Sequence, residues 1–209
     1  MKSVFLVLLC LLNIIYGNTS YIATKTQVLH PEKGIQISLE INDFSDKIIL
    51  TLVGPSNVYY SVGFGKGSMH DAWSVVITGN DDDWSEYKLG KDTAGDELSK
   101  TFELISNEIT DNIRTLIISR SLSQNIDNDI YYEFNTKTEW IDIIWCYGSQ
   151  SKYSMHIGYG EDRLYLDKTT NNYNNELYYD NNLQSNTSTN WPIFFIACIL
   201  IGIVACIYY

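Results

Sequence analysis

The sequence predicts an all-β fold, an antiparallel β-sandwich of immunoglobulin-like architecture, in the central part of a chain of 209 residues. Three observations predict it. Apolar and polar side chains alternate with a period of two through most of the central segments. These segments are short, rich in Ile, Val, Tyr and Trp, and separated by Gly, Asn and Asp. No segment has the apolar period of an amphipathic helix longer than two turns.

The segment 35–41 alternates strictly between apolar and polar residues, as a strand buried on one face does. Further strands are predicted in order along the chain, each bounded by turn residues. They span residues 47–53, 59–64, 73–78, 101–105, 114–119, 131–134 and 139–147. Many short strands at this spacing are typical of a β-sandwich.

The first residues, 1–17, are predicted to be a secretory signal peptide. Lys2 precedes an apolar run over residues 4–12, and Gly17 provides the small residue expected at a cleavage point. The run is short for a membrane span, which disfavours a first transmembrane helix. We therefore expect a mature chain that begins near Asn18 and is exported.

Residues 191–209 carry no charge and are predicted to form a hydrophobic membrane anchor. Their length suits a hydrocarbon core of about 30 Å. The anchor is either a single transmembrane helix or the signal for a glycosylphosphatidylinositol (GPI) anchor. The small residues at 185–188 favour the GPI anchor, whereas the short polar spacer after them disfavours it. Both alternatives place the chain on the extracellular face of the plasma membrane.

One domain is expected between these ends, over residues 27–166. Residues 167–190 are rich in Asn and lack an apolar period, which predicts a disordered stalk. Asn18 and Asn186 begin possible glycosylation sequons on either side of the domain, as in a glycoprotein. Cys146 is the only cysteine of the predicted ectodomain, so no internal disulfide is expected, and it is interpreted as a small buried strand residue.

The net charge of −11 disfavours binding to nucleic acid or to anionic lipid. The sequence contains neither a nucleophile-elbow motif with a Ser/His/Asp set nor a His-Glu-x-x-His motif. An electron-transfer or ligand-binding domain is therefore expected rather than an enzyme with its own catalytic groups.

The order of several short motifs resembles the DOMON domain family over most of residues 30–160. A strand ending in Gly-Phe-Gly (63–65) leads to a loop that carries Met69, and residues 72–77 supply the next strand. An Arg-x-Leu step at 120–122, Asp127 and Asp129, and the strand 144–148 (Ile-Trp-Cys-Tyr-Gly) follow. That strand is similar to the family's Trp-Ala-Tyr-Gly, with Cys146 in place of Ala, and His156 comes after it.

This resemblance implies a haem b site of the cytochrome type, in which one Met and one His are the axial ligands of the iron. The residues that match are Met69 and His156, which would be both the metal ligands and part of the cofactor-binding site. A thioether and an imidazole on opposite sides of one ring are a known ligand pair for haem iron. Other members of the family lack one or both ligands and bind sugars or serve as interaction modules.

Two competing ligands lie beside the matched residues. Met155 is adjacent to His156, and His70 is adjacent to Met69, so neither adjacent pair can reach both faces of one ring. A pair formed by His70 and His156 is the rival geometry. Structural roles are the other alternative, because Met commonly fills gaps in apolar cores.

An apolar slot for the porphyrin could be lined by aromatic side chains, although aromatic residues of a sandwich are more often part of its core. The candidates are Phe64, Trp73, Trp145 and Tyr153. Lys152 is a candidate partner for a haem propionate, together with Lys66 and Arg163 as alternatives.

The function expected from this resemblance is the transfer of single electrons, because Met/His ligation leaves no open position on the iron. The donor would be a small reductant or a redox protein. The rest of the chain carries no further helices that could pass electrons across a bilayer, so a partner is implied. The alternative is a haem-free surface module of the same fold that binds carbohydrate or protein.

Overall fold

The computed structural model describes residues 20–79, 83–91 and 93–171. The predicted signal peptide and anchor, most of the predicted stalk, and Asn18 and Asn186 lie outside these residues. The described part of the chain contains one short 3₁₀-helix, η1 (Pro31–Lys33), and otherwise strands, turns and loops. None of its helices is long and apolar enough to span a bilayer.

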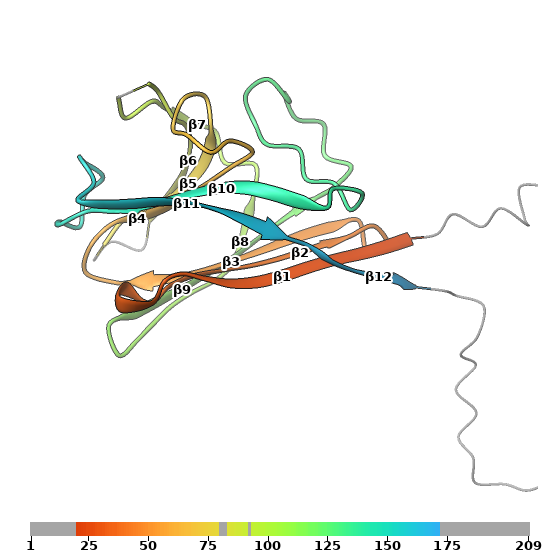
Figure 1. Cartoon of the computed structure of the whole chain (residues 1–209), viewed down its shortest axis with the longest axis horizontal. Helices are drawn as coiled ribbons and strands as arrows, with labels where there is room; N and C mark the ends of the chain where they lie inside the picture. Colours follow the sequence, from red (N-terminus) through yellow and green to blue (C-terminus); the bar gives the residue numbers. More distant parts are fainter. Residues whose placement is uncertain (1–19, 80–82, 92, 172–209) are drawn as a thin grey trace, which may run out of the picture. The chain divides into compact units, whose positions relative to one another are not determined.

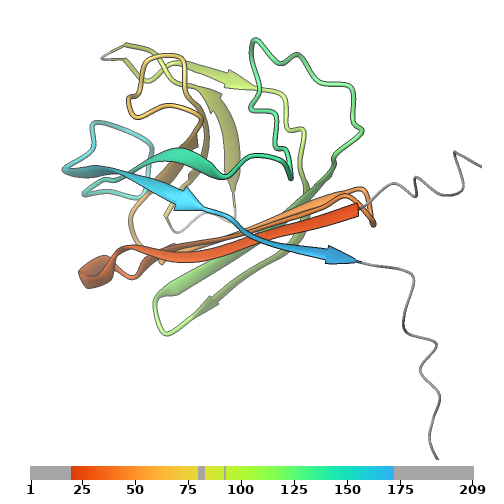
Figure 2. The same ribbon diagram turned by 45° about the vertical axis from the view of Figure 1, so that its right-hand side comes forward.

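Two antiparallel six-stranded sheets pack face to face, as expected for a β-sandwich (Figures 1 and 2). Sheet A has the order β12-β1-β2-β3-β9-β8, and sheet B has the order β11-β10-β4-β5-β6-β7. The strands of sheet A are β1 (Ser20–His30), β2 (Ile35–Asn42), β3 (Lys47–Pro55), β8 (Glu103–Thr110), β9 (Ile113–Ser121) and β12 (Asp167–Asn171). The strands of sheet B are β4 (Tyr60–Phe64), β5 (Trp73–Ile77), β6 (Trp84–Lys88), β7 (Asp96–Leu98), β10 (Trp140–Tyr147) and β11 (Gly158–Tyr165).

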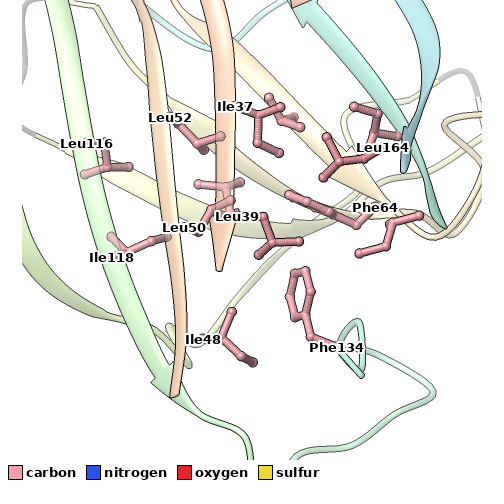
Figure 3. Packing of buried hydrophobic residues seen from close by; sticks show 14 of the residues in the cluster. Ile37, Leu39, Ile48, Leu50, Leu52, Phe64, Leu116, Ile118, Phe134 and Leu164 are labelled. Carbon is pink, nitrogen blue, oxygen red and sulfur yellow. The ribbon is translucent and has the colours of Figure 1, made fainter. Parts of the chain in front are cut away.

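The hydrophobic core fills the space between the sheets. In β2, β3 and β9 every second residue is buried, because the side chains of a strand alternate between its two faces. Leucine and isoleucine residues of these strands pack against Phe64, Phe134 and Leu164, which come from β4, a loop and β11 (Figure 3). Apolar side chains from both sheets therefore fill the middle of the space between them.

Most of the predicted strands are confirmed. The predictions 35–41, 47–53, 59–64, 73–78, 114–119 and 139–147 correspond to β2, β3, β4, β5, β9 and β10. The predicted strand 101–105 overlaps only the start of β8. The predicted strand 131–134 is wrong, because this segment is irregular. Its aromatic side chains still pack on the core, which explains the apolar pattern without a sheet ladder.

Five strands have no counterpart among the predictions, namely β1, β6, β7, β11 and β12. Sheet A extends past both predicted limits of the domain, because β1 begins at Ser20 and β12 ends at Asn171. Strand β11 lies at the edge of sheet B and buries only Leu164, so its sequence lacks a regular apolar alternation. Strand β6 carries Glu86 on its buried face, which breaks the expected pattern.

Candidate functional site

The outer face of sheet B, which is turned away from sheet A, is covered over its middle strands. All five residues of β4 and all five of β5 are buried, so both faces of these strands are shielded. On the outer face lie Ser61, Ser74 and Val76, and the Ser61 and Ser74 hydroxyls are 2.5 Å apart. Since sheet A covers only the inner face, the outer face must be shielded by other segments.

One of these segments is the loop 148–157, which follows β10 and is held by several backbone hydrogen bonds. The Tyr59 amide donates to the Gln150 carbonyl, and the Gly79 amide donates to the Ser151 carbonyl. The Tyr59 hydroxyl donates to the Ser154 carbonyl at 2.5 Å. The loop that carries His156 is therefore fixed against β4 and the end of β5.

An aromatic cluster on the outer face anchors the same loop. The ring of Tyr153 lies edge-on to Tyr59, with ring centroids 5.3 Å apart, and contacts Tyr87 of β6 at 5.0 Å. Its hydroxyl donates to the Ala94 carbonyl. Burial raises the pKa of Tyr153 to about 12, and burial also raises the pKa of Tyr59. Both phenols therefore remain protonated at neutral pH.

Cys146 lies on the outer face of β10, close to this cluster. Its residue is partly exposed, yet burial of the thiol raises its pKa to about 12. A thiolate is the form that attacks electrophiles and binds metals. Cys146 therefore remains a neutral thiol, in agreement with its interpretation as a structural strand residue.

The loop between β4 and β5 carries Met69, which is partly buried. The loop begins at Gly65, whose φ of +83° favours glycine, and the Gly65 amide donates to the Asp142 carbonyl. At its other end the Asp71 amide donates to the Leu89 carbonyl. His70 is exposed, and its Nδ1 lies 2.6 Å from the Asp71 carboxylate, so this imidazole is already engaged.

The loops of Met69 and His156 both reach the outer face of β11. A Cβ on Gly67 would lie 3.3 Å from the Glu161 carboxylate, so the Met69 loop touches β11 there. The ring of His156 contacts Tyr159, with centroids 5.1 Å apart. Tyr159 and Glu161 are two residues apart, hence on the same face and about 7 Å apart along the strand. The two loops thus meet neighbouring positions of one strand.

The imidazole of His156 has no polar partner in the described part of the chain. It makes the ring contact with Tyr159, and neither of its nitrogens has a hydrogen bond or ion pair with a described residue. Ile144 of β10 lies on the same face, opposite both Glu161 and Gly63. Among the described residues, the imidazole of His156 therefore has the ring of Tyr159 beside it and no hydrogen-bonded partner.

The other predicted site residues are divided between the two faces of sheet B, and of these Phe64 and Trp73 contact each other, with ring centroids 5.3 Å apart. Phe64 and Trp73 lie in the core between the sheets, on the opposite face of sheet B from Tyr153. Trp145 also packs against the core, where His30 contacts its ring edge-on. Lys152 is exposed. The alternatives are paired elsewhere, Lys66 with Asp71 at 3.8 Å and Arg163 with Asp142 at 2.9 Å.

One pocket opens beside the loop of Met69, and another has no residue of either loop in its lining. One, of about 400 Å³, is lined by Asp71, Lys88–Gly90 and Thr93–Asp96. The other, of about 270 Å³, lies beside Arg120 and Phe134. Neither has Met69 or His156 in its lining. Among the described residues no three His, Cys, Asp or Glu side chains gather as a metal site.

Sequence reasoning missed Tyr59, Tyr87 and Glu161 as parts of this region. A signal was present in β4 and β5, whose sequences YSVGF and WSVVI are apolar or small throughout rather than alternating. Continuous runs of this kind indicate strands that are buried on both faces. Such a run predicts a covering segment but does not identify it.

No family model and no curated protein matches the chain. Among solved structures it resembles the cytochrome b domain of pyranose dehydrogenase from Coprinopsis cinerea. That likeness has a TM-score of 0.49 and 12% identity, and it covers 70% of this chain and 81% of that one. It also resembles the cytochrome domain of Myriococcum thermophilum cellobiose dehydrogenase, with a TM-score of 0.47, 14% identity and coverage of 69% and 88%.

Proposed function

We propose that this chain is an extracellular, membrane-tethered electron-transfer domain that binds haem b through Met69 and His156. The domain would accept single electrons from a small reductant or a redox protein and pass them to an acceptor. The anchor and the export signal are those expected from residues 191–209 and 1–17.

One observation carries the proposal. The loops of the two expected ligands, far apart in the sequence, meet neighbouring positions on the outer face of β11, at Glu161 and Tyr159. Two side chains that bind one iron must come from segments that lie close together, and these two loops meet the same strand. The resemblance to the DOMON pattern selects the same two residues.

The donor groups of this region fit a haem with one sulfur and one nitrogen ligand. Met69 offers a partly buried thioether, and His156 offers an imidazole without a hydrogen-bonded partner among the described residues. The competing donors are less available: Cys146 and Tyr153 stay protonated because burial raises the pKa of each to about 12, and His70 is held by Asp71. Ile144 lies on the same outer face of sheet B, opposite Glu161.

Haem b held by Met69 and His156 would supply a one-electron couple. Met69, as the softer ligand, would favour the reduced iron and raise the potential. Tyr153 and the backbone bonds of the loop 148–157 would hold His156 in position. A one-electron couple needs an electron acceptor as well as a donor, so an external acceptor is part of the proposal.

Titration of the purified full-length chain with haemin tests the proposal directly. We expect a Soret band that saturates at one haem per chain, and sharp visible bands after reduction. A protein that stays colourless and takes up no haem would exclude the electron-transfer function.

A second function is favoured by the pocket of about 270 Å³ beside Arg120. Its lining combines amide, carboxylate and guanidinium groups with apolar surface, from Gln124, Asn125, Asn128, Glu133, Ile126 and Phe134 among others. Ligand sites combine apolar surface with a few placed polar groups, and the hydroxyls of a sugar could bond to such groups here. In this alternative a colourless protein binds a monosaccharide, and Asn128→Ala weakens that binding.

A further inference from the structure

Strand β8 leaves one edge of sheet A open. It pairs with β9 on one side, and no described strand pairs with its other side. The β8–β9 hairpin projects from the sandwich in both views, at the lower left (Figures 1 and 2). Most residues of β8 are exposed. An open edge of this kind presents free backbone donors and acceptors to another strand.

The exposed edge strand carries apolar side chains on the face of sheet A that is turned toward the core. Leu104 lies opposite Ile118, and Ile109 lies opposite Arg114. The two β9 residues, Ile118 and Arg114, are buried. Leu104 and Ile109 are nevertheless 54% and 48% exposed, because the core includes no residue of β8. Ile105 forms the bulge between Leu104 and Ser106 and is 55% exposed.

The order of side chains along β8 is complementary to itself when reversed. With the bulged Ile105 set aside, the strand alternates between the two faces about its middle residue, Asn107. In an antiparallel pair centred on Asn107, Leu104 of one copy meets Ile109 of the other, twice. On the opposite face Ser106 meets Glu108, and Glu103 meets Thr110. No two like charges are directly opposed, and the apolar residues pair with each other.

We propose that two copies of this chain associate through β8, edge to edge and antiparallel, with the twofold axis at Asn107. The two copies of sheet A then form one continuous sheet. This contact is isologous, so it closes as a dimer and does not propagate into a fibre.

Charge sets the conditions under which the dimer forms. The chain carries a net charge of −11, and each copy contributes Glu103 and Glu108 to one face of the shared ladder. Since salt screens exposed charges, the dimer is stronger at 0.5 M than at 0.02 M salt, by about tenfold. Dimers held by ion pairs respond in the opposite direction.

Cysteine crosslinking in the full-length chain tests the register. Asn107→Cys is expected to give a disulfide-linked dimer under mild oxidation, well above the background of the unmodified chain, because opposed residues bring their Cβ atoms within about 5.5 Å. Leu104→Cys and Ile109→Cys each remain near background alone, and an equal mixture of the two gives the crosslinked dimer. Ile113→Cys, exposed on β9, is the control and stays near background.

Three results would overturn the proposal. Crosslinking of Asn107→Cys at background level would mean that β8 does not pair with β8 of a second copy. Efficient crosslinking of Leu104→Cys alone would mean a different register. Equal crosslinking of Ile113→Cys would mean non-specific collision. The variant Ile109→Arg, which places a charge on the apolar pair, should weaken dimerisation about tenfold while leaving the chain folded. None of these results depends on haem.

Discussion

Replacing Glu86 with alanine is expected to lower the free energy of unfolding by about 3–5 kcal/mol, since the change breaks a buried charged network. Glu86 is fully buried on the inner face of β6. One carboxylate oxygen accepts from the Thr101 and Phe102 amides, at 2.6 and 3.0 Å. The other accepts from Trp73 Nε1 and from the Thr101 hydroxyl, at 3.2 and 2.9 Å. Alanine leaves all of these donors without their acceptor.

Arg120 makes the loss larger. Its guanidinium donates to the Thr101 hydroxyl and the Tyr132 carbonyl and packs on the rings of Phe102 and Phe134. Burial lowers the pKa of Arg120 to about 10, and the charge of Glu86 opposes this shift. Without Glu86 the buried cation loses its nearby counter-charge, which is costly in a low-dielectric interior.

Urea unfolding of matched variants measures this effect. Glu86→Gln keeps the shape but turns one acceptor into a donor, so we expect a smaller loss of about 1–3 kcal/mol. Glu97→Ala serves as the control. It removes an exposed carboxylate of β7 that accepts from the Ser85 hydroxyl of β6, and it should lower the free energy of unfolding by about 0.5 kcal/mol. A loss below about 1 kcal/mol for Glu86→Ala would contradict the structural role of this network.

Removing either expected ligand should abolish the haem spectrum. His156→Ala takes away the only nitrogen ligand of the proposed pair, and Met69→Ala takes away the sulfur. Since changes in residues that merely support a ligand cost about 10–100-fold in metal affinity, loss of a ligand should weaken haem binding about 100-fold or more. Both residues are only partly buried, so the fold should persist. Haemin titration followed at the Soret band gives the affinity.

The neighbouring residues serve as matched controls. His70→Ala removes an imidazole held by Asp71, and Met155→Ala removes a thioether that is 87% exposed. Each should leave the spectrum unchanged. If His70→Ala abolishes it and Met69→Ala does not, the ligands are the two histidines and the proposed pair is wrong.

The sandwich could be predicted because its central strands obey one rule. In β2, β3 and β9 one face is buried and the other is in solvent, so the side-chain alternation is visible in the sequence. Edge strands do not obey it: β8 buries no residue and β11 buries only Leu164, so neither sequence shows a regular alternation of buried and exposed positions. Strand β6 was not predicted because the sequence pattern alone does not distinguish the buried carboxylate of Glu86 from an exposed one.

The candidate site could be predicted only in part, for a geometric reason. The motifs indicate that Met69 and His156 lie in loops after strands, and the structure agrees. A strand pattern does not tell over which face of a sheet a loop folds. That information lies in contacts such as Tyr59 with Ser154 and Tyr153 with Ala94, which are distant in the sequence. For the same reason the sequence did not separate Phe64 and Trp73 from Tyr153, although in the structure Phe64 and Trp73 point to the core face of sheet B.

The midpoint potential of the haem-loaded chain, compared with that of Met69→His, tests the ligand pair most directly. A thioether raises the potential of a haem iron relative to a second imidazole. If Met69 and His156 hold the iron together, Met69→His retains a six-coordinate spectrum and lowers the midpoint potential. If the potential and spectrum of Met69→His equal those of the unmodified chain, the sulfur of Met69 is not bound to the iron and the proposed ligand pair is wrong.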